Sequence, residues 1–341
     1  MNAPPTPRNG GVVMAAIRTY RLSDFAGLAD LINAAGTGAR TMTAAALEEF
    51  LDYPWFRPEA DLFVAERAGS PGLLGARDVR VWARGDEPVP ILESWGALHP
   101  GAGNGEAGCE LLRAALRRAG EIVAARRAAH GIFQVRCDMD DAASASLFEA
   151  CGLRQARILL TILRPNLDNL RPARFPEHIA VRPYRVGRDE EAWVAAFNEA
   201  FADHWGGFMG MSMPLWAKYV HRRWFKPEIS LVAWDGSEIA GFGHFVIHHE
   251  RNALTGKRQA LMRYIGVRPR WRGLGLGVAL TRAGLLAARD KGMEACVSGV
   301  DSENVTGAHR IYEREGFITT GRHLMFRVEI GQASPIAGAN L

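Results

Sequence analysis

The sequence predicts an α/β protein built from two domains of similar design. The first reason is length, because 341 residues exceed what one domain usually needs. The second is a repeat, since Ile17-Arg18-Thr19-Tyr20-Arg21 has a counterpart in Val181-Arg182-Pro183-Tyr184-Arg185, 164 residues later (181 − 17). Each segment precedes an amphipathic helical pattern, with Leu31-Ile32-Asn33-Ala34 in one and Ala196-Phe197-Asn198-Glu199 in the other. We therefore expect an internal repeat.

Composition narrows the class of protein. A hydrophobic fraction of 48% is typical of a globular protein, and no apolar run approaches the roughly 18 residues of a membrane helix. Residues 1–11 lack the apolar segment of a signal peptide. The four cysteines show no C-x-x-C spacing, which argues against a zinc ribbon or disulfide framework. We expect a cytoplasmic protein that does not act at a membrane.

The charges and histidines indicate neither nucleic acid nor a metal as a ligand. The net charge is +4, but the arginines are spread along the chain instead of forming a basic stripe with aromatic residues. His244 and His248 fall on one face of a strand pattern, yet no cysteine or paired carboxylate completes a metal site. We expect a half-exposed strand face there.

The second half is predicted to alternate strands and helices. Asp235-Gly236 suits the tight turn of a β-hairpin between residues 231–234 and 239–242. The remaining predicted elements are a strand at 244–248, a loop at 250–258, a strand ending at 267, a helix from 276 to a C-cap at Gly292, a strand at 295–300, a helix through Tyr312 and a last strand at 324–328.

A basic, glycine-rich loop joins the strand ending at Val267 to the next helix. Gly273, Gly275 and Gly277 allow a tight turn, so that backbone N–H groups converge at the N-terminus of a helix, where anions are favoured. Arg268, Arg270 and Arg272 add positive charge to the same loop. We expect it to bind a phosphate or pyrophosphate.

The spacing of this loop separates three kinds of phosphate site. A P-loop needs Lys and then Ser or Thr, but Val278 and Ala279 follow Gly277. A dinucleotide fingerprint needs G-x-G-x-x-G, whereas the spacing here is G-x-G-x-G. Residues 272–277 instead resemble the R/Q-x-x-G-x-G/A loop of the GNAT superfamily of N-acetyltransferases. A second GNAT signature is similar to residues 301–317, through Asn304, Ala308, Ile311, Tyr312, Gly316 and Phe317.

This resemblance implies two tandem GNAT folds, each a mixed, mostly antiparallel sheet flanked by helices. It implies direct transfer from acetyl-CoA, without a metal, to a primary amine of a small-molecule or peptide acceptor. Tyr312 would protonate the sulfur, Asn304 would contact the pantetheine arm, and backbone N–H groups of residues 265–267 would polarise the carbonyl. The implied cofactor-binding residues are Ile265, Gly266, Val267, Arg270, Arg272, Gly273, Leu274, Gly275, Leu276, Gly277 and Asn304.

The acceptor site is expected in the loop after the first helix of the second half. Asp203 would bind the amine, His204 would deprotonate it and Trp205 would shape an apolar wall. A helix-capping Asp and a surface His explain these residues equally well.

The first half is expected to be a degenerate copy. Setting Pro100 on Pro269 places Glu106 opposite Gly275, and an acidic side chain there would repel a pyrophosphate. Setting Gly152 on Gly316 places Phe148 opposite Tyr312, which removes the hydroxyl. The sequence leaves open whether this half holds CoA.

The prolines at 165, 172 and 176 suggest a semi-rigid linker between the halves. The expected organisation is a tail at 1–12, the degenerate domain at 13–165, the linker at 166–178, the active domain at 179–330 and a tail at 331–341. Two alternative functions remain at this point, a CoA-binding sensor without turnover and an acyltransferase that uses a longer acyl-CoA. The oligomeric state is not indicated.

Overall fold

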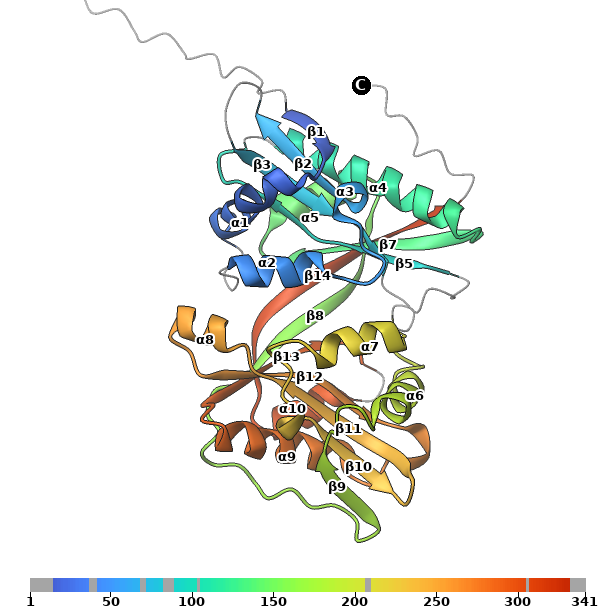
Figure 1. The fold of residues 1–341 in the computed structure, drawn as a ribbon, viewed down its shortest axis with the longest axis vertical. Coiled ribbons are helices and arrows are strands. Elements are labelled where there is room, and N and C mark those ends of the chain that lie inside the picture. Colours follow the sequence, from blue (N-terminus) through green and yellow to red (C-terminus); the bar gives the residue numbers. More distant parts are fainter. Residues whose placement is uncertain are drawn as a thin grey trace, which may run out of the picture.

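The computed structural model describes residues 15–36, 42–67, 72–81, 89–102, 105–205, 210–304 and 307–331. The two predicted tails therefore lie almost wholly outside the described residues. Two α/β halves are stacked along the long axis of the molecule, and two long strands run between them (Figure 1). Among the described residues, no helix is both long and apolar enough to cross a bilayer.

The N-terminal half ends with a long strand that leads toward the other half. Its helices are α1 (Phe25–Ala34), α2 (Ala44–Leu51), α3 (Pro58–Asp61), α4 (Glu106–Ala125) and α5 (Ala142–Ala150). Its strands are β1 (Ala15–Thr19), β2 (Leu62–Arg67), β3 (Leu73–Asp78), β4 (Arg80–Val81), β5 (Ile91–Ser94), β6 (Gly96–Leu98), β7 (His130–Asp138) and β8 (Arg154–Arg164).

The C-terminal half repeats the same alternation. Its helices are α6 (Glu190–Ala200), α7 (Met213–Val220), α8 (His249–Thr255), α9 (Leu276–Asp290) and α10 (Ala308–Arg314). Its strands are β9 (Ile179–Pro183), β10 (Leu231–Asp235), β11 (Glu238–Val246), β12 (Gln259–Val267), β13 (Ala295–Asp301) and β14 (Ile318–Gly331). The predicted α/β class, with mostly antiparallel sheets flanked by helices, is confirmed.

The internal repeat extends to individual hydrogen bonds. Near the end of α1, the Asn33 side chain accepts from Met42 N at 2.7 Å and donates to Met42 O at 3.1 Å. Near the end of α6, Asn198 bonds Met211 in the same way, at 2.8 and 3.0 Å. An asparagine that the sequence placed at equivalent positions thus holds the loop after the first helix of each half.

The last strand of each half crosses into the sheet of the other. One sheet has the order β1-β2-β3-β6, and a ten-stranded sheet has the order β4-β5-β7-β14-β8-β13-β12-β11-β10-β9. The strand β8, from the first half, pairs with β13 of the second half, and β14 pairs with β7 of the first half. The two exchanged strands are antiparallel to each other and join the halves (Figure 1).

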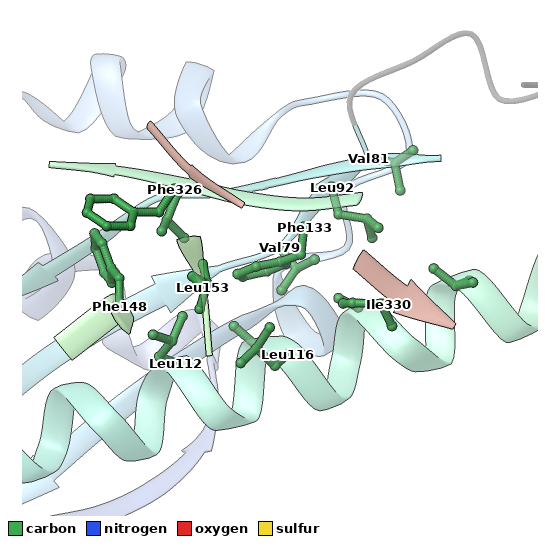
Figure 2. Packing of buried hydrophobic residues seen from close by; sticks show 14 of the residues in the cluster. Val79, Val81, Leu92, Leu112, Leu116, Phe133, Phe148, Leu153, Phe326 and Ile330 are labelled. Carbon is green, nitrogen blue, oxygen red and sulfur yellow. The ribbon is translucent and has the colours of Figure 1, made fainter. Parts of the chain in front are cut away.

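This exchange builds the C-terminal strand into the N-terminal core. Phe326 and Ile330 of β14 are 1% and 8% exposed and lie among Phe133, Phe148 and Leu116 (Figure 2). Burial of each large apolar side chain contributes roughly 1.5–3 kcal/mol, so the N-terminal core depends on the end of the chain.

Three predictions for the second half need correction. The strand expected at 244–248 is mostly a continuation of β11, and the loop expected at 250–258 holds α8, which ends at Gly256 with φ +63°. His244 is 1% exposed, so the expected half-exposed face is wrong. The physical reason is that α6 and α7 cover this face with the rings of Trp193 and Trp216, which pack edge-on to the imidazole.

Helices cover both faces of the C-terminal sheet. On one face, α9 and α10 pack through Leu285 and Tyr312 against Cys296 and Val300 of β13. On the other face, α6 and α7 pack against Phe242 of β11. The predicted linker is also packed, because Leu167 is fully buried in the core on the α9 and α10 face.

Candidate active site

The strands β12 and β13 separate in the middle of the C-terminal sheet. They pair in parallel from Gln259 with Ala295 to Met262 with Ser298, and the pairing stops there. Beyond that point β12 stays with β11 and β13 stays with β8. The result is a strand opening between residues 263–267 of β12 and 299–301 of β13.

Two backbone donors of β12 face this strand opening. Arg268 N donates to Ala240 O at 3.0 Å, so residue 268 forms a hydrogen-bonded pair with β11. Because the direction of backbone groups alternates along an antiparallel strand, the N–H groups of Ile265 and Val267 point away from β11. Gly266 N–H points toward β11. Of the N–H groups of residues 265–267, which were expected to polarise the carbonyl, only two therefore face the strand opening. A Cβ on Gly266 would lie 2.3 Å from the Phe242 ring, which explains the glycine by packing.

The glycine loop leads directly from this strand into α9. Gly273 and Gly275 have φ values of +81° and +78°, a left-handed conformation that other L-residues adopt only under strain, and Gly275 is the N-cap of α9. Gly277 already belongs to the helix. The N–H groups of the first turn, starting at Leu276, have no partner within the helix, and no described side chain caps them. Such free N–H groups at a helix N-terminus are suited to bind an anion, so the backbone is compatible with the anion site that the sequence predicted.

The three arginines of the loop do not all face this anion site. Arg268 bonds Glu199 at 2.7 Å, and Arg270 bonds Glu238 at 3.0 Å. Both guanidinium groups also lie within 5 Å of the Trp271 ring, at 4.8 and 4.9 Å from its centroid. Glu199 and Glu238 therefore neutralise part of the positive charge that was expected at the glycine loop.

Arg272 links the glycine loop to the end of α6. Its guanidinium donates to Val267 O at 3.3 Å, to Ala200 O at 3.1 Å and to Asp203 Oδ2 at 3.2 Å. Asp203, expected to bind the acceptor amine, is thus an ion-pair partner of the loop. Arg272 holds the loop against the helix that precedes the predicted acceptor segment.

Tyr312 lies on α10, with only 9% of its surface exposed. Burial raises the pKa of its hydroxyl, and the neighbouring Cys296 raises it further. The hydroxyl therefore stays protonated at neutral pH, as an acid that donates to a leaving thiolate must be. Asn304 lies in the turn between β13 and α10, where its carbonyl oxygen accepts from Gly307 N at 3.0 Å.

Asp301, the last residue of β13, is a buried carboxylate that the sequence analysis did not assign. Continuing the register of Met262 with Ser298 by three residues brings Asp301 level with Ile265 across the strand opening. Strand alternation points its side chain away from the face of Cys296 and Val300, toward the α6 and α7 side. It is 5% exposed, and burial raises its pKa, although nearby Arg157 and His204 act in the opposite direction. In the sequence, the only signal that could have identified Asp301 is its position at the end of a strand.

The predicted acceptor residues separate in the structure. His204 lies close enough to Asp301 to lower the pKa of that carboxyl group. The Nδ1 atom of His204 is 3.0 Å from Trp205 O. The Trp205 ring lies under two guanidinium groups of the exchanged strands, Arg327 of β14 at 3.8 Å and Arg157 of β8 at 4.8 Å. Residues 206–209 of the same predicted segment lie outside the described residues.

The N-terminal half copies the backbone of this site but not its chemistry. Gly105, with φ +83°, caps α4 as Gly275 caps α9. Glu106 is consequently the counterpart of Leu276, one position later than the sequence alignment placed it, because the loop after Pro100 is one residue shorter. Its carboxylate still occupies the first turn of the helix.

A buried arginine occupies the space of the N-terminal strand opening. The parallel pairing of β5 with β7 stops at Ser94, as that of β12 stops at Met262. Arg77 lies there, 9% exposed, with Nη1 3.3 Å from Ser94 Oγ and its guanidinium 5.5 Å from the Phe148 ring. A Cβ on Gly96 would come within 2.7 Å of this guanidinium. Burial lowers the pKa of Arg77 to about 10.

Comparisons with known proteins agree with this geometry. The model of the acetyltransferase (GNAT) family matches residues 191–317. A mycothiol acetyltransferase of Thermobispora bispora is 34% identical over 235 residues, which are 67% of this chain and 74% of the relative. One from Geodermatophilus obscurus is 31% identical over 264 residues, 72% and 80% of the two chains.

Solved structures show the same fold over nearly the whole chain. A GCN5-related N-acetyltransferase from Sphaerobacter thermophilus superposes with a TM-score of 0.71 at 24% identity, covering 93% of this chain and 96% of its own. A tandem GNAT protein from the clavulanic acid biosynthesis pathway gives 0.66 at 16% identity, covering 94% and 100%.

Proposed function

Because the chain belongs to the GNAT family of acetyltransferases and shares its fold with a solved tandem GNAT protein, we propose that its C-terminal half transfers an acetyl group directly from acetyl-CoA to a primary amine. The observation that carries the proposal is the set of three features in one half. These are the anion site at the start of α9, the strand opening with two inward N–H groups, and the buried Tyr312 hydroxyl.

The residues fit the chemistry of acyl transfer. The first-turn N–H groups of α9 bind the pyrophosphate, and the N–H groups of Ile265 and Val267 face the place where the carbonyl oxygen gains charge. The amine attacks the carbonyl carbon, so that a C–N bond forms while the C–S bond breaks. Tyr312 gives its proton to the departing sulfur.

We propose that Asp301, assisted by His204, accepts the proton that the amine loses. Burial raises the pKa of Asp301, which makes it a stronger base than an ordinary carboxylate. Because Asp301 lies across the strand opening, on the side opposite Tyr312, we expect proton removal and proton donation on different faces of the sheet.

We further propose that the N-terminal half does not turn over acetyl-CoA. Arg77 fills the space that corresponds to the strand opening, Phe148 has no hydroxyl, and Glu106 repels a pyrophosphate at the start of α4. This half supports the site through the exchanged strands.

The test is a thiol-release assay with acetyl-CoA and a panel of primary amines, which includes the form of mycothiol that lacks its acetyl group. Tyr312→Phe should lower kcat by about 10²- to 10⁴-fold, the usual range for loss of general acid catalysis. Tyr20→Phe, which removes another buried hydroxyl in the N-terminal half, is the matched control and should leave kcat unchanged.

The outcomes distinguish the alternative functions. Binding of acetyl-CoA without thiol release from any amine would favour a sensor. A higher kcat/KM with longer acyl-CoA would favour a different acyl donor. Full activity of Tyr312→Phe would contradict the proposed acid.

A further inference from the structure

The acceptor must approach from the α6 and α7 side of the sheet. Tyr312 lies on the α9 and α10 face, so the sulfur that it protonates leaves on that face. The amine attacks from the other face, where the aromatic core of α6 and α7 meets the N-terminal half. This step rests on the proposed function.

Arg263 projects from β12 at the start of the strand opening, on this acceptor side. It directly follows the last residue that pairs with β13, and a bulge in β12 leaves it without a register partner in β11. Its guanidinium is surrounded by the rings of Tyr219, Trp224 and Tyr264, at 4.9, 5.4 and 5.5 Å from their centroids. One donor, Nη2, bonds Tyr219 Oη at 3.0 Å.

The charge of Arg263 has no counterion in the described part of the chain. No described carboxylate lies within 4 Å of it, unlike Arg268 and Arg272 of the same site, and its buried Nε has no hydrogen-bond partner there. Next to it, His244 also has a buried, unpartnered Nε2, and burial together with the charge of Arg263 holds the pKa of this histidine well below its usual value. A buried polar group without a partner destabilises the folded protein, and a charged group does so more strongly.

Two other partly exposed arginines of this half do have a carboxylate partner. Arg182 is paired with Asp189 at 2.6 Å and Arg282 with Glu315 at 2.8 Å. A fixed guanidinium framed by aromatic rings binds planar anions through parallel hydrogen bonds, because its donors form a rigid fork.

The N-terminal half completes the surroundings of Arg263. The pKa of Tyr53, which follows α2, is raised by burial and then by Tyr219 and Tyr264, while Arg80 and Arg263 lower it, so these groups lie close together. Trp224 Nε1 donates to Glu49 Oε2 of α2 at 3.1 Å, which fixes one wall of the aromatic enclosure to the other half.

We propose that Arg263 binds an anionic group of the acceptor, a carboxylate or a phosphate, while the amine of the same molecule reaches the strand opening. Arg263 and Ile265 are two residues apart, roughly 7 Å along the strand, so a small amine with its anion on the order of 7–10 Å from the nitrogen spans both. The acceptor class is therefore an amino acid-like or aminoalkyl phosphate-like molecule.

The test compares matched amines in the thiol-release assay. One series contains ω-amino carboxylates, a second contains aminoalkyl phosphates, and a third contains alkylamines of the same chain lengths. The wild type should show at least a tenfold higher kcat/KM for one anionic series than for the alkylamines. Arg263→Gln should remove this preference by raising KM for the anionic amines about 10- to 100-fold, with the alkylamines changed less than threefold.

Three further measurements serve as controls for the proposed role of Arg263. Arg258→Gln removes an exposed, ion-paired arginine near the start of the same strand and should leave the preference intact. Arg263→Lys keeps the charge without the fork and should retain part of the preference. Acetyl-CoA affinity should not change in Arg263→Gln.

The outcomes also separate this inference from the proposed function. If no amine of any series is acetylated, the proposed function fails. If anionic and neutral amines are acetylated equally by the wild type, the function stands and the role of Arg263 is refuted. An equal loss for all amines in both Arg263 variants, with a lower thermal midpoint, would show that the residue is only structural.

Discussion

Replacing Gly275 by alanine should weaken acetyl-CoA binding, whereas the same change at Gly105 should not. Both glycines cap the helix that follows the loop, with φ values of +78° and +83°, and a Cβ at either one would meet nothing within 4 Å. The two substitutions therefore introduce the same backbone strain, about 1–2 kcal/mol for an alanine in the left-handed region, without a clash.

The magnitude follows from where that strain is released. In the free Gly275→Ala protein, the substituted loop can relax out of the left-handed conformation, and acetyl-CoA must restore it in order to contact the first-turn N–H groups. Up to about 1–2 kcal/mol is then lost from binding, which raises Kd by about 5- to 30-fold. Under the proposed function, acetyl-CoA binds only at the glycine loop of the C-terminal half, so Gly105→Ala should leave Kd within about twofold of the wild-type value.

The assay is calorimetric titration of acetyl-CoA, together with thermal unfolding of both variants. Similar decreases in the thermal midpoint would show that the strain is equivalent at the two positions. The reasoning is refuted if Gly105→Ala weakens binding as much as Gly275→Ala, or if Gly275→Ala lowers the midpoint without changing Kd.

Three more predictions follow from other parts of the structure. In the wild type, kcat/KM should fall as the pH drops through the raised pKa of Asp301, because the base is then protonated. Asp301→Asn should lower the rate and should remove this decrease at low pH from the pH profile. Asn198→Ala and Asn33→Ala should each lower the free energy of unfolding by about 1–3 kcal/mol, because in each variant two backbone groups lose their hydrogen-bond partner. Denaturant titration measures this loss. Only Asn198→Ala should also raise KM for the amine. Truncation before β14 should expose apolar surface in the N-terminal half as well, detected by dye binding and loss of cooperative unfolding, and an intact N-terminal unfolding transition would contradict the shared core.

Local patterns in the sequence were sufficient for the glycine loop and the hairpin. Gly273 and Gly275 were predicted to turn the chain, and both have positive φ values. The turn at Asp235-Gly236 joins β10 and β11 as expected. In these cases a residue type is required by the backbone within a few positions, so its effect can be read without knowledge of distant contacts.

Strand exchange could not be predicted in the same way. The strand β8 pairs with β13 and β14 pairs with β7, and in both pairs the partners lie far apart in the sequence, so no local pattern specifies the partner. The same limit applies to Asp203, whose ion pair with Arg272 joins residues 69 positions apart.

Long-range packing also determined the surroundings of two arginines. Arg77 and Arg263 look like ordinary surface residues in the sequence, since arginine is common throughout this chain. Only the structure shows that one fills the strand opening of the N-terminal half and that the other lies beside the strand opening of the C-terminal half. This difference suggests how one half of a repeat loses a site while the other keeps it.

The central claim is that one acetyl-CoA binds per chain, at the start of α9. Calorimetric titration of the wild type and of Arg272→Glu tests it most directly, with thermal unfolding to confirm that the variant is folded. We expect a stoichiometry of one in the wild type and no detectable binding in Arg272→Glu. Two sites in the wild type, or binding that persists in the folded variant, would contradict it.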